Sequence, residues 1–187
     1  RSEHLRRELH AGAPALHLLQ WQFFGPDVLG YHVTNVLLHA LGSVLLAAVF
    51  RASGFGRLAA AAGGALFLLH PVNVEAVAWI SQLKTSACFV LSMATLLAFP
   101  RRPWLATPLF FLALLAKPTA AFLLPVAAVL AWVRLFEGRP PWRHLAYLGL
   151  WAAGFLLLSV AQVEVNRRSG APDAALGPEG LARLPMV

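Results

Sequence analysis

Long apolar runs separated by short polar turns dominate the chain from residue 29 to residue 163. A helix that crosses a bilayer needs about 20 predominantly apolar residues. The pattern therefore predicts an all-α fold, a polytopic transmembrane helix bundle of about six spans. The predicted spans are Leu29–Phe50, Leu58–Leu69, Val74–Phe99, Trp104–Ala116, Thr119–Phe136 and His144–Val163.

Two of these runs, the second and the fourth, are too short to cross a bilayer as straight helices. Each ends directly at a polar corner, His70-Pro71 or Lys117-Pro118. Proline lacks a backbone N–H and suits the first turn of a helix better than its interior. We therefore expect two short helices that end inside a cavity, each followed by a new helix.

The segments outside the six runs complete the predicted organisation. Residues 1–28 are predicted to be an external loop with an interfacial amphipathic helix, because Leu16, Leu19 and Phe23 keep roughly helical spacing. Residues 29–163 form the transmembrane domain, and residues 164–187 are predicted to be a truncated external loop. The chain begins without Met or a signal peptide, so we expect it to be a fragment.

Composition supports a membrane protein over the other classes. Hydrophobic residues make up 59% of the chain and charged residues 12%, about half of the roughly 25% in soluble domains. The one cysteine, Cys88, excludes a disulfide framework.

The formal net charge of +7 is explained by membrane topology and does not indicate a nucleic-acid partner. Arginines gather in alternate connections, as in cytoplasmic loops, and tryptophans flank them as interface anchors do. We expect these connections to be cytoplasmic and the polar corners to lie outside. The arginines are Arg51, Arg57, Arg101, Arg102, Arg134, Arg139 and Arg143.

A first polar cluster lies in the outer half of the first run. Tyr31 and His32 precede Asn35 and His39, and the last three fall within about 60° of one another on a helix. Side chains of this kind either bond neighbouring helices together or line a functional cavity. The sequence leaves both interpretations open.

A second cluster runs from His70 to Lys84. His70 or Asn73 is predicted to cap the helix break, and Glu75, Trp79 and Gln82 fall on one face of an unbroken helix, with Lys84 opposite. A membrane carboxylate needs a cation, a donor or a proton. A functional cavity is one interpretation. The other is structural: an ion pair of Glu75, for instance with Lys117, or a Lys84 side chain that reaches the membrane interface.

The third cluster is Lys117-Pro118-Thr119, where a lysine in the turn between two helices suits an anion. Its alternative is an interface lysine whose side chain reaches water. Lys84, Lys117 and His70 at one level would suit a phosphate. We find no soluble-enzyme motif and predict no metal site, because the histidines are too scattered.

Three stretches resemble the membrane domain of the TMTC-like protein O-mannosyltransferases, which are GT-C glycosyltransferases related to the PMT enzymes and are often followed by TPR repeats. The resemblance covers roughly residues 14–163, and its most specific part is H-P-x-x-V-E-A-V-A-W-I. The chain departs from it at Gln82 and at Thr85, where many relatives have an acid or Asn. The stretches are YHVTNVLLHALGSVLL, FLLHPVNVEAVAWISQLKTSACFVL and LALLAKPTAAFLLPVAAVL.

This resemblance implies transfer of a sugar from a polyprenyl-phosphate-linked donor to a protein Ser/Thr hydroxyl, with no other cofactor. The catalytic acid of such enzymes follows the first span, so it is expected upstream of residue 1 and the catalytic residue stays unknown. By position in the family pattern, His70, Glu75, Lys84 and Lys117 would line the donor and acceptor cavity. Arg-over-Lys usage with abundant Ala and Gly is typical of a GC-rich bacterium, so we expect the chain to lie in a bacterial inner membrane.

Two other functions fit the same features. Short runs with polar breaks also mark the broken helices of transporters, so a transporter or flippase for a polar or lipid-linked solute is the main alternative. A purely structural membrane domain is the third.

Overall fold

The computed structural model describes residues 13–136 and 142–168, in which every regular element is helical. The chain divides into two units, residues 1–151 and residues 152–187. The first unit contains all the helices up to the early turns of α9. The all-α prediction is confirmed for the described residues.

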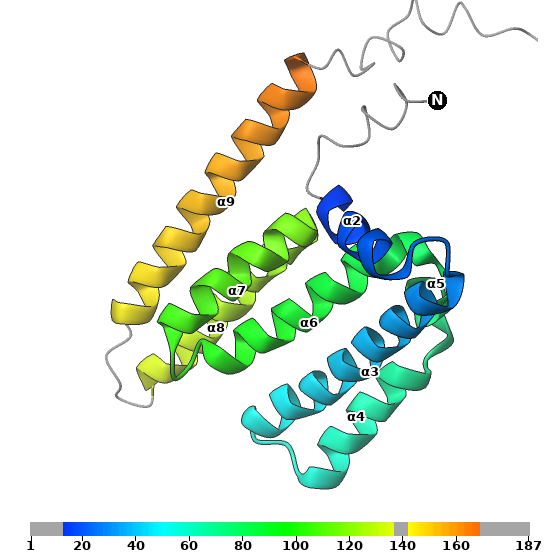
Figure 1. Cartoon of the computed structure of the whole chain (residues 1–187). Helices are drawn as coiled ribbons and strands as arrows, with labels where there is room; N and C mark the ends of the chain where they lie inside the picture. Colours follow the sequence, from blue (N-terminus) through cyan, green and yellow to red (C-terminus); the bar gives the residue numbers. More distant parts are fainter. Residues whose placement is uncertain (1–12, 137–141, 169–187) are drawn as a thin grey trace, which may run out of the picture. The chain divides into compact units, whose positions relative to one another are not determined.

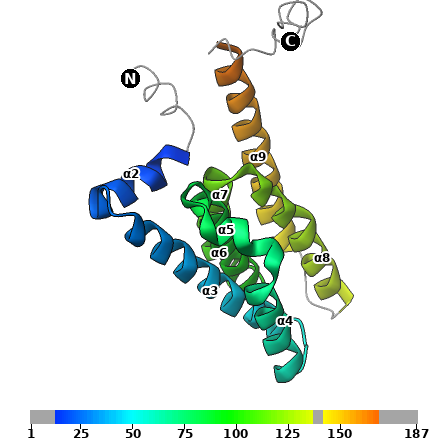
Figure 2. The same cartoon turned by 90° about the vertical axis from the view of Figure 1, so that its right-hand side faces the viewer.

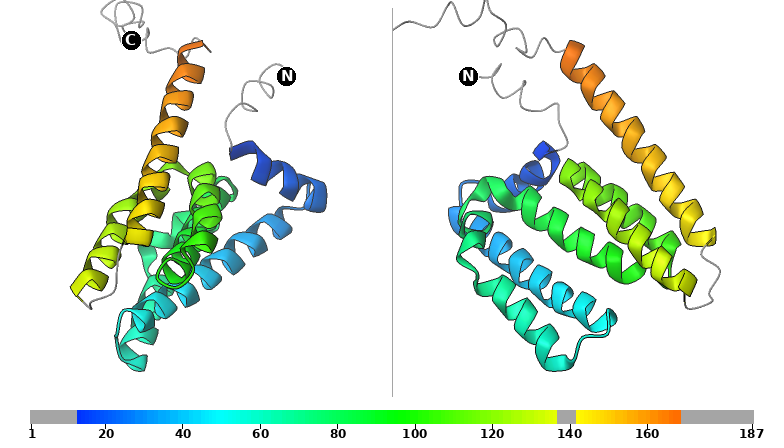
Figure 3. Two further views of the ribbon diagram at one scale, coloured as in Figure 1. Left: turned by 90° about the vertical axis from the view of Figure 1, so that its left-hand side faces the viewer. Right: turned by 180° about the vertical axis from the view of Figure 1, so that it is seen from behind.

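A helical hairpin and a central helix organise the first unit. Helix α3 (Val28–Ala52) packs antiparallel to α4 (Arg57–Leu69), and α6 (Leu83–Ala98) lies between α3 and α7 (Pro103–Ala116) (Figure 1; Figure 3, right). The turn after α3 is closed by Gly54, whose φ of +94° favours glycine, and by Arg51, which donates to the carbonyl of Phe55.

Helices α3 and α4 approach closely because small residues lie between them. Gly64 is buried, and a Cβ atom there would lie 2.9 Å from both the Ala47 Cβ and the Ser43 carbonyl oxygen. Ala60 is buried on the same helix. Small residues at such contacts are typical of helix pairs in membranes.

Among the described residues, three helices are long and apolar enough to cross a membrane: Val28–Ala52, Ile80–Ala98 and Trp142–Glu164. A fourth span is added if Arg57–Leu69 and Pro71–Ala78, bent by 50° at their junction, count as one. The helices Pro103–Ala116 and Pro118–Leu130 are apolar but shorter. Helices lie at all six predicted places, but six full spans are not confirmed.

The predicted third span, Val74–Phe99, is wrong as a single helix. It consists of α5 (Val74–Ala78), a short 3₁₀ turn η2 (Ile80–Gln82) and α6. Trp79 has extended backbone angles, φ −92° and ψ 122°, and separates α5 from η2. The single face predicted for Glu75, Trp79 and Gln82 is therefore wrong, because the helix that would carry it is interrupted.

Several other boundaries also differ from the prediction. The fifth run starts with the 3₁₀ helix η3 (Pro118–Phe122) before α8 (Leu123–Phe136), and α9 (Trp142–Arg168) continues past residue 163 into the predicted loop. Helix α2 (Ala13–Phe24) forms where the interfacial helix was predicted. The rest of both predicted external loops, residues 1–12 and 169–187, lies outside the described residues.

An aromatic cluster joins α7 to the start of α9 within the first unit. Trp151, Phe110 and Phe99 are all buried, and the Trp151 ring stacks on Phe110 at a centroid distance of 4.4 Å. The Trp151 indole N–H donates to Thr107 Oγ1 over 3.0 Å. This buried hydrogen bond satisfies the polar atom of the largest core side chain.

Candidate functional site

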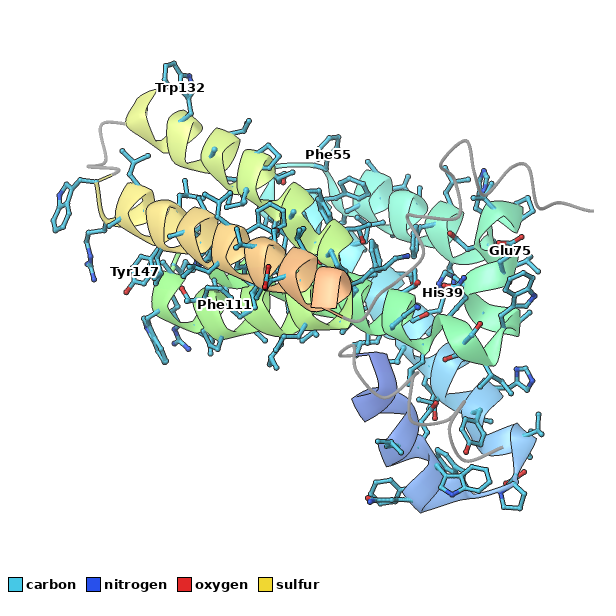
Figure 4. The ribbon with its side chains drawn as sticks, turned by 90° about the horizontal axis from the view of Figure 1, so that it is seen from above. His39, Phe55, Glu75, Phe111, Trp132 and Tyr147 are labelled. Atoms are coloured by element: carbon cyan, nitrogen blue, oxygen red, sulfur yellow. The ribbon has the colours of Figure 1, made fainter. Side chains whose placement is uncertain are left out.

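The polar clusters of the sequence gather toward one end of the first unit. The start of α3, the end of α4, the start of α6 and the end of α7 lie at this end (Figure 1). Helix α5 lies there too and faces the viewer in Figure 2. Glu75 and His39 lie toward the same side, away from Trp132 and Tyr147 (Figure 4). The turns that carry Arg51, Arg57, Arg101 and Arg102 lie at the opposite end.

The polar stripe of α3 bonds this helix to its neighbours. The Tyr31 hydroxyl donates to the Gly25 carbonyl (2.8 Å), and Asn35 Nδ2 donates to the Trp79 carbonyl (2.9 Å). His39 Nε2 lies 3.1 Å from the Leu68 carbonyl, and because a carbonyl only accepts, Nε2 carries the proton. Asn35 and His39 are buried, and His32 is half-buried. The helix-bonding interpretation therefore holds for Asn35 and His39.

The break between α4 and α5 is capped from both sides. The Val72 N–H donates to His70 Nδ1 over 3.2 Å, so His70 is the predicted cap. Asn73 donates to the Phe67 carbonyl over 2.6 Å, near the last turn of α4. The pair satisfies backbone groups that the break would otherwise leave without partners.

Glu75 and Trp79 are exposed at this end of the unit, and Lys84 is partly exposed. Across residues 13–136 and 142–168, neither Glu75 nor Lys84 takes part in an ion pair or a side-chain hydrogen bond. The carboxylate and the ammonium group are thus open to a ligand or to solvent.

Lys117 contacts a hydroxyl group. Its ammonium donates to Thr85 Oγ1 over 3.1 Å, and the Thr85 hydroxyl donates to Gln82 Oε1 over 2.6 Å. The alternative ion pair between Lys117 and Glu75 is wrong, because the neutral Thr85 holds the ammonium. The Lys117 side chain is half-buried beside an apolar bundle.

The sequence marked Thr85 only as a departure from the family pattern and assigned Asn73 only a capping role. Thr85 directly follows Lys84, so its position in a polar segment was visible, but its contact with Lys117 joins residues 32 positions apart. Such a contact depends on how α6 and α7 pack, which no local pattern reveals. The structure thus brings Lys117, Thr85 and Gln82 together, and joins Asn35 to the backbone of Trp79.

This end of the unit carries a cation that can bind an anion and, on a separate element, an exposed carboxylate that can accept hydrogen bonds. Lysine ammonium groups bind phosphate as point charges, and an exposed carboxylate accepts hydrogen bonds from hydroxyl groups. Within the described ranges, no three His, Cys, Asp or Glu side chains are grouped to hold a metal ion.

Two curated relatives from Drosophila melanogaster match the chain in part. It is 36% identical to Protein O-mannosyl-transferase Tmtc1 over 107 residues, which is 51% of this chain and 12% of that protein. It is 32% identical to Protein O-mannosyl-transferase Tmtc2 over 124 residues, 59% of this chain and 13% of that protein. The matched part therefore spans about an eighth of each relative. No protein-family model and no solved structure matches the chain.

Proposed function

We propose that this chain is part of a membrane glycosyltransferase. Its polar end, the end of the first unit with Glu75, Lys84 and Lys117, would bind a polyprenyl-phosphate-linked sugar donor. The sugar would pass to a Ser/Thr or related hydroxyl of a protein acceptor. The observation that carries the proposal is Lys117, a half-buried cation whose one side-chain hydrogen bond within the described residues goes to the neutral hydroxyl of Thr85. The partial similarity to two O-mannosyl-transferases supports the reaction class.

The proposed chemistry assigns Lys117 to the phosphate. When the bond between sugar and phosphate breaks, negative charge develops on the leaving phosphate, and a fixed cation in a poorly solvated site stabilises this charge. Thr85 and Gln82 orient the ammonium through their hydrogen bonds. Glu75 and Lys84, exposed and partly exposed at the same end, would contact the sugar or the acceptor. The base that accepts the hydroxyl proton is not assigned to any residue of this chain.

We also propose an orientation for the chain in a bacterial inner membrane. The arginine-bearing turns would face the cytoplasm and the polar end the outside, following the excess of basic residues in cytoplasmic loops. The donor lipid would then lie with its tail in the outer half of the bilayer, next to the apolar helices.

The assay compares the Lys117→Met and Lys117→Arg variants with the wild-type protein for transfer from a polyprenyl-phosphate sugar. We expect Lys117→Met to lower the transfer rate about 10- to 100-fold, because hydrogen bonds to charged groups contribute roughly 1.5–3 kcal/mol. Lys117→Arg keeps the charge and should retain most of the activity.

The matched control is Arg102→Met, which removes an exposed cation at the opposite end of the unit. This control should transfer sugar at the wild-type rate. Wild-type turnover in Lys117→Met would contradict the assignment of Lys117.

A transporter or flippase is the second candidate, favoured by the bent helix pair Arg57–Leu69 and Pro71–Ala78. Broken helices form the substrate sites of many transporters. Movement of a lipid-linked sugar across proteoliposome membranes, with no sugar transferred to acceptor, would support this candidate over the transferase.

A further inference from the structure

The break at Trp79 has no cause in the local sequence. Residues 74–98 contain neither proline nor glycine, yet α5 ends at Ala78 and Trp79 is extended. Sharp breaks in helices arise at Pro, at Gly/Ser pairs, at π-bulges, or where a side chain inserts into the hydrogen-bond ladder. A side chain from another helix is therefore the explanation to examine.

Asn35 supplies that side chain. Its Nδ2 donates to the Trp79 carbonyl over 2.9 Å, and the Gln82 N–H donates to the same oxygen over 3.0 Å. In a continuous α-helix this carbonyl would accept from the N–H of Leu83, four residues ahead. The Asn35 amide and the tight turn that ends at Gln82 together replace that bond.

The rest of the Asn35 amide makes no bond to the described part of the chain. The residue is fully buried, and its Oδ1 has no hydrogen-bond partner there. An unsatisfied buried acceptor costs about 1–3 kcal/mol. The cost of burying Asn35 is explained if its one interhelical bond, to the Trp79 carbonyl, maintains the break.

The neighbouring ends of the broken helices are closed in the same way. His39 contacts the Leu68 carbonyl, Asn73 donates to the Phe67 carbonyl, and Ser86 donates to the Ala76 carbonyl over 3.4 Å. Backbone groups at membrane depth need such partners, since lipid offers none. The segment from His70 to Gln82 is thus held by side chains of α3, of α6 and of its own first turn.

We propose that Asn35 is a positioning residue: it imposes the break at Trp79 and so sets the direction in which α5 presents Glu75. In a continuous helix from Val74 to Ala98, the turn that carries Glu75 would lie on the axis of α6. The break gives α5 its own direction. The link from this geometry to sugar transfer rests on the proposed function, whereas the hold of Asn35 on the segment does not.

The test measures amide hydrogen exchange of the protein in lipid nanodiscs. Asn35→Leu removes the donor at similar volume, and we expect amides of residues 74–83 to exchange about tenfold faster, with amides of residues 90–98 unchanged. The matched control is Thr34→Val, one position away, because the Thr34 hydroxyl bonds only the Gly30 carbonyl of its own helix. Unchanged or slower exchange in Asn35→Leu overturns the proposal.

A second variant separates this role from general packing. In Asn35→Asp, a protonated carboxyl carries an O–H donor and can restore the bond to Trp79, whereas an ionised carboxylate only accepts. Relative to wild type at the same pH, we expect the exchange of residues 74–83 to be near normal at acid pH and fast at alkaline pH. A ratio that does not depend on pH overturns the hydrogen-bonding role.

Transfer assays on the same variants connect the segment to catalysis. With positioning lost, we expect Asn35→Leu to lower kcat about tenfold and to leave the KM for the donor within about twofold. Faster exchange with wild-type kcat overturns the link to catalysis. If the wild-type protein transfers no sugar, the proposed function fails, and the exchange data still decide the role of Asn35.

Discussion

At the scale of single residues, buried and half-buried polar side chains each bond one particular group on a distant segment of the chain. Asn35 bonds the backbone of Trp79, His39 that of Leu68, and Lys117 the hydroxyl of Thr85. The sequence pattern singled out all three residues, because they are polar and lie within or between apolar runs. It did not predict their partners, which lie 44, 29 and 32 positions away. Helix packing selects such partners, and the spacing along one helix carries no information about it.

The hydrogen bond between Trp151 and Thr107 gives a stability prediction at this scale. Thr107→Val keeps the side-chain shape but leaves the buried indole N–H without its acceptor. We expect the free energy of unfolding to fall by about 1–3 kcal/mol, measured by denaturant titration in detergent micelles. Thr107→Ser keeps the hydroxyl and should fall by less. Wild-type stability in Thr107→Val, with a loss only in Thr107→Ser, would show that the methyl group, and not the hydrogen bond, matters.

At the scale of elements, helix positions follow from the sequence and helix continuity does not. The prolines at positions 71 and 118 correctly predicted new helical segments after the polar corners, because proline fits a first turn. The break at Trp79 was missed because residues 74–98 contain no residue that breaks a helix. There a contact from α3 overrides the local preference for one continuous helix.

The α3–α4 contact allows a prediction about an element pair. In Gly64→Ala the new methyl group would meet the Ser43 carbonyl oxygen and the Ala47 side chain at 2.9 Å, so the two helices must move apart. Overpacking of this kind costs about 1–3 kcal/mol, to be measured as a lower free energy of unfolding in mixed micelles. The control is Gly149→Ala, since a Cβ there has no neighbour within 4 Å. Equal stability of Gly64→Ala and wild type would contradict the close contact.

At the scale of the molecule, the described helices of the first unit separate the arginine-bearing turns from the charged residues of the polar end. Arginine turns lie at one end, and Glu75, Lys84 and Lys117 lie toward the other. Helices that alternate in direction bring this about, because every second connection returns to the same end. Composition alone gave the surplus of positive charge, and the alternation explains why this surplus does not surround the polar end.

Membrane orientation gives the prediction at this scale. Single cysteines at exposed Ser53 and Val72, in a Cys88→Ala background, report opposite ends of the α3–α4 hairpin. We expect an impermeant maleimide to label Val72→Cys on intact cells and Ser53→Cys only after the membrane is disrupted. Labelling of both from the same side would contradict the alternation, and the reverse pattern would contradict the proposed orientation.

The sequence by itself determined the class of protein, the places of the helices and the residues that carry its polar chemistry. These properties depend on the lengths of apolar runs and on prolines, which act over a few neighbouring residues. Only the tertiary structure decided that the predicted third span is broken, that Asn35 bonds the Trp79 carbonyl at this break, and that Lys117 contacts Thr85 and not Glu75. The reason is physical: each outcome depends on which side chain reaches a backbone or side-chain group of another helix, and packing alone sets those distances.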